Sequence, residues 1–207
     1  AFQSMLFPHP DLKIFESPDN RAQTAQYLKD FICLAGKMQA GVLVFGSPKN
    51  RQHGELSDEE TQAVAKEFFN SLGDAAQECK TKFCIEPNAP QYACDFVTTA
   101  RQGVDLVKVV GNPGFGLHLD IACMTLAGDD IAQSITAAAP FLCHFHISSP
   151  MLEAVEERDD VDHQTAADTL RAIGYDKYVS IEMRPGDEGK NADRVRTAVT
   201  LAQKYYT

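Results

Sequence analysis

The chain has 207 residues, 44% of them hydrophobic, which is enough to bury a sizeable core, and a single domain spanning 1–207 is expected at this length. Its net charge of −10 disfavours docking onto a phosphate backbone or an anionic membrane, so neither nucleic acid nor a membrane is expected as a partner. No apolar run is long enough to span a bilayer, and the N-terminal residues lack the basic start and apolar segment of a signal peptide, which predicts a cytoplasmic protein.

Short apolar runs alternate along the chain with longer segments of helical period. Ser57, with Glu60 at the capping-box position, marks the start of one of these helices. The strict alternation predicts a parallel sheet with helices outside it, joined by right-handed crossovers. In chain order, the pattern predicts a strand at 3–7, a helix at 21–39, a strand at 42–46, a helix at 57–79, a strand at 83–86, a helix at 95–110, a strand at 116–120, a helix at 129–138, a strand at 143–148, a helix at 164–173, a strand at 179–183 and a helix at 192–206.

The six cysteines are scattered and contain no CxxC pair. This spacing is typical of neither a zinc site nor a disulfide framework. The sequence therefore predicts reduced thiols that mostly lie in the core, at Cys33, Cys79, Cys84, Cys94, Cys123 and Cys143.

A carboxylate or an imidazole stands near the C-terminal end of each of four successive predicted strands. α/β folds gather their chemistry at this end of the sheet, and uncompensated charges buried there cost several kcal/mol each. A shared divalent cation would compensate them, and three oxygen donors with one imidazole suit Mn²⁺, Mg²⁺ or Co²⁺, with Zn²⁺ as an alternative. The predicted ligands are Glu86, Asp120, His146 and Glu182.

Single acids at strand ends are more often caps, surface residues or salt-bridge partners than ligands, so this prediction depends on the whole set. His144 shares the face of His146 but lies deeper, which favours a place beneath the metal as a partner of its ligands or as a barrel-layer residue. His118 shares the face of Asp120. For His118, substrate contact and a packed core position are equal alternatives.

Several polar residues near the predicted strand ends are candidates for substrate binding. Ser47, Lys49 and Asn50 follow the strand at 42–46 and could hold a sugar hydroxyl or a phosphate, or they could be solvated loop residues. Asn88 follows Glu86 in the "IEPN" segment. Arg184 follows Glu182 and could bind an anionic group, with surface pairing to nearby acids as the competing interpretation.

Several segments along nearly the whole chain together resemble the sugar phosphate isomerase/epimerase family, whose fold is the xylose-isomerase-like TIM barrel. These segments are "FQSMLF", "VLVFGSPKNR", "IEPNAPQYACDFVTT", "GFGLHLDIACM", "HFHISSP" and "LRAIGYDKYVSIEM". The resemblance implies a divalent metal held by the four predicted ligands, with Glu86 and Glu182 also transferring protons. It further implies an α/β barrel in which the six predicted strands are the third to the eighth, so that the first two β/α units are lacking.

Two positions depart from the pattern of the ketose 3-epimerases in this superfamily. Those enzymes have a substrate-binding histidine three residues after the ligand aspartate and an arginine six residues after the ligand histidine. Here these positions hold Cys123 and Leu152. The substrate therefore stays open.

The predicted function is a metal-dependent sugar or sugar phosphate isomerase or epimerase that moves a proton through a metal-stabilised enediolate. A phosphodiester hydrolase of the abasic-site endonuclease type and a non-catalytic barrel that binds sugar or metal are the alternatives. A sheet that lacks two strands would expose parallel edges, which predicts a homo-oligomer, a missing N-terminal segment or extra elements that cover the gap.

Overall fold

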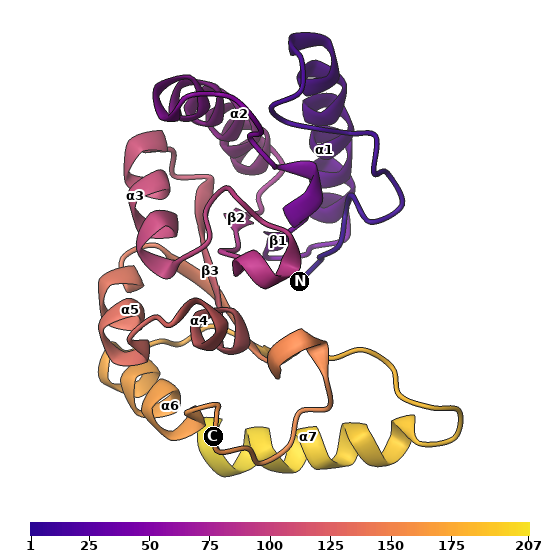
Figure 1. The fold of residues 1–207 in the computed structure, drawn as a ribbon, viewed down its shortest axis with the longest axis vertical. Coiled ribbons are helices and arrows are strands. Elements are labelled where there is room, and N and C mark those ends of the chain that lie inside the picture. Colours follow the sequence, from indigo (N-terminus) through magenta and orange to yellow (C-terminus); the bar gives the residue numbers. More distant parts are fainter.

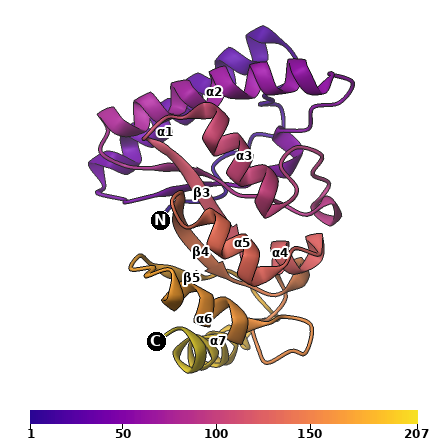
Figure 2. The ribbon, with the colours of Figure 1, turned by 90° about the vertical axis from the view of Figure 1, so that its left-hand side faces the viewer.

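A curved parallel sheet lies inside an arc of helices. The computed structural model describes residues 1–207, and its five strands are hydrogen-bonded in chain order. Figure 1 shows the helices around one side of the sheet, and Figure 2 shows the same layer from that side. The strands are β1 (Leu43–Phe45), β2 (Phe83–Ile85), β3 (Phe115–Asp120), β4 (Leu142–Ile147) and β5 (Val179–Ile181).

A helix follows each strand and returns the chain to the same end of the sheet, as the alternating sequence pattern predicts. None of these helices combines the length and the apolar character that crossing a bilayer requires. They are α1 (Pro18–Lys37), which precedes the sheet, then α2 (Asp58–Glu78), α3 (Ala100–Val110), α4 (Ile121–Ala127), α5 (Ile131–Ala138), α6 (His163–Ala172) and α7 (Asn191–Tyr206).

The predicted strand at 3–7 is wrong. Phe2 makes one isolated parallel bridge to Leu43, and the chain then enters a turn in which Ser4 has a φ of 56°. A left-handed residue interrupts the extended backbone that a strand needs. Met5 and Leu6, whose apolar character suggested the strand, are buried from this turn instead.

Local caps decide where α3 and α4 begin, and both helices depart from the sequence pattern. The helix predicted at 95–110 begins only at Ala100, where the Thr99 side chain accepts a hydrogen bond from the Gln102 amide. The short α4 was not predicted, and Asp120 both ends β3 and caps α4 through the Cys123 amide. The predicted capping box of α2 is confirmed, with Ser57 and Glu60 each bonding the other's backbone.

The two faces of the sheet differ in character. Apolar strand residues such as Phe45, Ile85 and Leu117 join a cluster of 37 buried hydrophobic residues. The other face carries the polar side chains of β3 and β4, and the register of these strands places His118 beside His144 and Asp120 beside His146. The polar residues of the predicted site therefore share the concave face of the sheet.

The prediction that all six cysteines are reduced is wrong for one pair. Cys33 of α1 and Cys79, which caps the C-terminal end of α2, form a disulfide with their Cα atoms 5.2 Å apart. The two cysteines are 46 residues apart in the chain, and only the packing of α1 against α2 brings them together. The other four cysteines are free.

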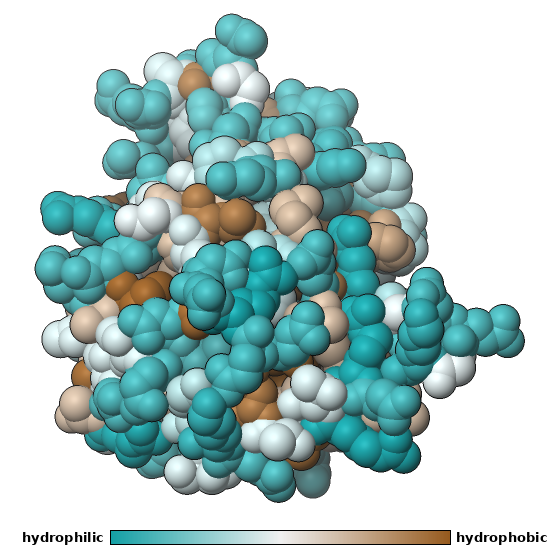
Figure 3. All heavy atoms as spheres, turned by 60° about the horizontal axis from the view of Figure 1, so that its bottom comes forward, coloured by the Kyte–Doolittle hydropathy of each residue, from teal (hydrophilic) through white to brown (hydrophobic).

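The surface around α7 is mostly hydrophilic, with apolar side chains in small separate patches (Figure 3). This appearance agrees with the excess of acidic over basic residues, 29 against 19. No large apolar face is visible in this view.

Candidate metal centre

Four side chains from four strand ends converge at one point on the concave face. Each offers one ligand atom, and these atoms all lie within 4.8 Å of one another. Because the strands are parallel, their C-terminal ends lie at the same end of the sheet. There β4 pairs with both β3 and β5. The four residues are Glu86, which follows β2, Asp120, the last residue of β3, His146 of β4, and Glu182, which follows β5.

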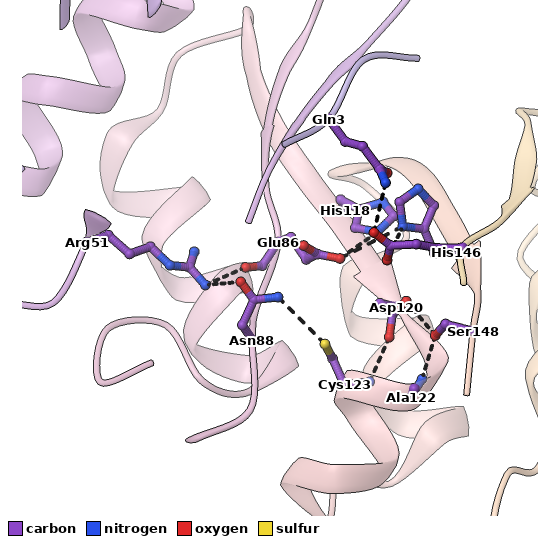
Figure 4. A network of polar contacts seen from close by, with 11 residues as sticks. Gln3, Arg51, Glu86, Asn88, His118, Asp120, Ala122, Cys123, His146 and Ser148 are labelled. Atoms are coloured by element: carbon purple, nitrogen blue, oxygen red, sulfur yellow. Dashed lines mark hydrogen bonds and ion pairs between the residues drawn. The ribbon is translucent and has the colours of Figure 1, made fainter. Parts of the chain in front are cut away.

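His146 lies between two of the carboxylates. Its Nδ1 is 3.3 Å from Oε2 of Glu182 and 3.9 Å from Oε1 of Glu86. This nitrogen is buried and has no hydrogen-bond partner. A buried polar atom without a partner is costly, and a ligand at this point would satisfy it. Figure 4 shows Glu86 reaching toward His118 and His146.

Neighbouring groups hold the carboxylates of Asp120 and Glu182 in position. Oδ1 of Asp120 accepts a hydrogen bond from the Cys123 amide at 2.7 Å, and Oδ2 accepts one from the Ser148 hydroxyl at 2.6 Å. Gln3 donates to Oε1 of Glu182 at 2.8 Å, across the open side of the sheet. These bonds fix the carboxylates and leave further lone pairs free for a cation.

The crowded negative charge changes the protonation of the cluster. Burial, together with repulsion from Glu86 and Glu182, raises the pKa of Asp120 to about 7. Burial acts against a charged His146, but the attraction of the neighbouring carboxylates of Glu182, Glu86 and Asp120 outweighs it and raises the pKa of this histidine. The three carboxylates, the imidazole and the unpartnered His146 nitrogen fit a divalent cation.

The two remaining histidines of this face lie beneath the cluster. His118 is completely buried, with its Nε2 3.3 Å from Oε1 of Glu86. Burial and the neighbouring His146 lower the pKa of His118. His118 does not line the cavity, and it contacts Glu86, as the alternative of a packed core position has it. His144 stacks on His118 with ring centroids 5.5 Å apart, in the deeper position that the sequence predicts.

A cavity of about 470 Å³ opens above the cluster. Small-molecule sites commonly have volumes of about 300–1,000 Å³. The structure brings the other candidate substrate residues to the wall of this cavity, together with Cys123 and Leu152. These candidates are Ser47, Lys49, Asn50, Asn88 and Arg184.

Sequence reasoning missed Arg51, Gln3 and Ser148. Arg51 is fully buried, and its Nη2 donates to the Glu86 carbonyl at 2.7 Å and to Oδ1 of Asn88 at 2.9 Å (Figure 4). It thereby fixes the segment that carries Glu86 into the site. Arg51 ends the quoted "VLVFGSPKNR" segment, but no local pattern distinguishes a buried arginine from a solvated one.

Comparison with known protein families identifies the fold. Residues 6–204 match the xylose isomerase-like TIM barrel family. The structure is similar to that of D-psicose 3-epimerase with D-tagatose from Clostridium cellulolyticum H10, with a TM-score of 0.83 and 18% identity over 95% of this chain and 75% of that one. It is also similar to the IOLI protein with a binding zinc atom, with a TM-score of 0.75 and 20% identity over 93% of this chain and 73% of that one. At these identities the likeness concerns the fold.

Curated relatives match shorter parts of the sequence. D-psicose 3-epimerase of Ruminiclostridium cellulolyticum is 29% identical over 116 residues, which is 56% of this chain and 39% of the relative. D-psicose 3-epimerase of Agrobacterium fabrum is 32% identical over 80 residues, which is 39% of this chain and 27% of the relative. Each match thus spans well under two thirds of the relative's length.

Proposed function

The chain belongs to the xylose isomerase-like TIM barrel family, and we propose that it is a divalent-metal-dependent isomerase that epimerises or isomerises a small sugar or a sugar phosphate. The observation that carries this proposal is the cluster of three carboxylates and one imidazole at the base of a sugar-sized cavity. The similarity to proteins named D-psicose 3-epimerase supports it, since those names state a sugar epimerisation.

The cation would be held by Glu86, Asp120, His146 and Glu182, because these residues supply the converging donor atoms. When bound, a divalent cation polarises a carbonyl oxygen and so makes the neighbouring carbon-bound proton more acidic. Mn²⁺, Mg²⁺ and Co²⁺ suit the oxygen-rich donor set, and Zn²⁺ also accepts it.

Glu86 and Glu182 are the proposed proton-transfer groups. They reach the cluster from β2 and β5, with the His146 ring between their oxygens. One carboxylate takes the proton from the carbon beside the carbonyl, which leaves an enediolate, and the other returns a proton to the opposite face. These two proton transfers invert the configuration at that carbon and give an epimer. Return of the proton to the neighbouring carbon would instead interconvert a ketose and an aldose.

Neighbouring residues prepare these two carboxylates for proton transfer. Gln3 holds one oxygen of Glu182 and leaves the other facing His146. His118 contacts Glu86 from the buried side, and Arg51 holds the backbone of the same residue. Fixed carboxylates lower the cost of reaching a productive geometry, because little reorganisation remains when the substrate binds.

Ser47 and Asn88, on the cavity wall, are the proposed contacts for sugar hydroxyl groups. The Asn88 amide oxygen already accepts from Arg51, which orients its Nδ2 toward Cys123. Neither Cys123 nor Leu152 is a strong hydrogen-bond donor. The chain therefore recognises its substrate differently from a ketose 3-epimerase that has histidine and arginine at these positions.

Deuterium exchange from solvent tests the proposal. The protein with Mn²⁺ is incubated in D₂O with a panel of ketoses and aldoses, and NMR follows deuterium at the carbon beside the carbonyl and the appearance of an isomer. Exchange that requires both Mn²⁺ and Glu182 supports the isomerase, with the exposed Glu55→Gln as the charge-matched control. Tight Mn²⁺ binding without exchange for any sugar or sugar phosphate would favour the non-catalytic alternative. Cleavage of abasic-site DNA would favour the hydrolase.

A further inference from the structure

Two cationic side chains stand on the wall of the cavity whose base is acidic. Of the 19 lysines and arginines in the chain, Lys49 and Arg184 are the two that line it. Lys49 lies in the turn Pro48–Asn50 after β1, and Arg184 follows β5. Because β1 and β5 are the two edges of the sheet, these residues approach the cavity from opposite sides.

The backbone of both residues is anchored, while their charged groups have no partner. Nζ of Lys13 donates to the Lys49 carbonyl at 2.7 Å, and Nη2 of Arg194 donates to the Arg184 carbonyl at 3.0 Å. The Arg184 amide also donates to the Leu152 carbonyl at 2.9 Å. The Lys49 ammonium and the Arg184 guanidinium make no hydrogen bond or salt bridge, and both side chains are exposed.

Several surface cations elsewhere in the chain do pair with carboxylates. Arg158, Arg171 and Arg196 each pair with a nearby carboxylate. Lys49 and Arg184 remain unpaired although acids outnumber bases by 29 to 19 and the same cavity holds Glu86, Asp120 and Glu182. Their two positive charges are therefore free to bind an anion from solvent.

We propose that the substrate carries an anionic group, a phosphate ester or a carboxylate, which Lys49 and Arg184 bind while the carbonyl end reaches the acidic cluster. This inference rests on the proposed function, because it assigns the carbonyl end to that cluster. Arginine binds either anion through two parallel hydrogen bonds, and lysine adds a point charge. Cys123 and Leu152 offer the sugar little polar binding on the same wall, so charge pairing supplies binding energy and specificity.

Calorimetric titration in the presence of Mn²⁺ tests the inference without requiring turnover. The probes are D-fructose, D-fructose 6-phosphate and D-fructuronate, which separate the neutral sugar from the two sources of negative charge. We expect at least one anionic probe to bind about tenfold more tightly than D-fructose. That preference should weaken as ionic strength rises, because salt screens exposed charges.

Charge-removing variants locate the effect. Lys49→Gln and Arg184→Gln should each reduce the preference for the anionic probe about three- to tenfold, with unchanged affinity for Mn²⁺ and for D-fructose. Lys66→Gln and Arg101→Gln remove the same charge from exposed helix positions outside the cavity and should leave the preference intact. This comparison separates local binding from an effect of net charge.

Three results would overturn the inference. The first is equal affinity for neutral and anionic probes, or no binding of either. The second is a preference that survives both cavity substitutions. The third is that an abasic-site DNA duplex binds more tightly than any of the three sugar probes and does so through the same two residues. That result would assign Lys49 and Arg184 to phosphodiester recognition. Deuterium exchange into neutral ketoses without any anionic preference would leave the proposed function standing while this inference falls, so the two failures are distinguishable.

Discussion

The buried Asp120 carboxyl makes the metal-free protein less stable at neutral pH, and Asp120→Asn is expected to reveal this cost. Its pKa is raised from an ordinary 3.8 to about 7 by burial and by Glu86 and Glu182. Between these two values the folded protein holds a proton that the unfolded chain has lost, so raising the pH favours unfolding. The stability that this group preserves at pH 4 is therefore lost as the pH rises to about 7.

The size of the effect follows from the two pKa values. A difference of this size corresponds to about 4 kcal/mol, of which part is repulsion shared with Glu86 and Glu182, so about 2–4 kcal/mol is expected for Asp120 itself. Asparagine retains an oxygen that can accept from the Cys123 amide and cap α4. Its amide can donate to the Ser148 hydroxyl, which then accepts instead of donating. The substitution thus removes the charge with little loss of structure.

Urea unfolding at several pH values measures the difference. In a chelator, Asp120→Asn should be about 2–4 kcal/mol more stable than the wild type at pH 8 and no more stable at pH 4. Added Mn²⁺ should shrink or remove this difference at pH 8, because a ligand at 1,000 times its dissociation constant stabilises the wild type by about 4 kcal/mol and the neutral amide of the variant binds the cation more weakly than the carboxylate. The exposed Asp159→Asn is the control. It should change neither the free energy of unfolding in chelator nor the stabilisation by Mn²⁺. A variant that is less stable than the wild type in chelator at pH 8, or equally stabilised by Mn²⁺, would refute the reasoning.

Three further predictions follow from the site and the fold. Glu182→Gln should lower deuterium exchange into substrate by more than about a hundredfold, while calorimetry still detects Mn²⁺ binding, because the amide keeps an oxygen donor but cannot accept the proton. His146→Ala should weaken Mn²⁺ binding by about ten- to a hundredfold, and excess Mn²⁺ should restore part of the exchange; no restoration would place the histidine in the proton path. Thr99→Ala should lower the free energy of unfolding by about 1 kcal/mol, since it removes the N-cap that starts α3; an unchanged urea midpoint would show that the cap contributes nothing.

The sequence predicted those features that depend on local pattern and on the parallel sheet. Strand periodicity located β1 to β5. The parallel arrangement then required the residues at their C-terminal ends to lie at the same end of the sheet. Three statements remain predictions. They are that the strand-end residues hold a metal, that the chain forms a homo-oligomer and that residues 1–207 are a single partial barrel domain.

Features that depend on contacts between distant segments could not be predicted. Gln3 contacts Glu182 across 179 residues of sequence, and the Cys33–Cys79 disulfide spans 46. Gln3 also fell within the wrongly predicted strand at 3–7. Its role arises because the turn after Phe2 carries that segment to the open side of the sheet, where Glu182 lies. Neither composition nor periodicity specifies such a contact.

The division of the sheet into two faces explains how the fold tolerates an acidic cluster that opposes folding when no cation is bound. The apolar face and its helices form the 37-residue hydrophobic cluster, which stabilises the sheet independently of the opposite face. The concave face can then hold His118, His146 and three carboxylates close together, at a cost that the apolar layer offsets. Strengthening the apolar layer should therefore raise stability without changing metal affinity, whereas relieving the charge on the concave face should raise stability and weaken metal binding together.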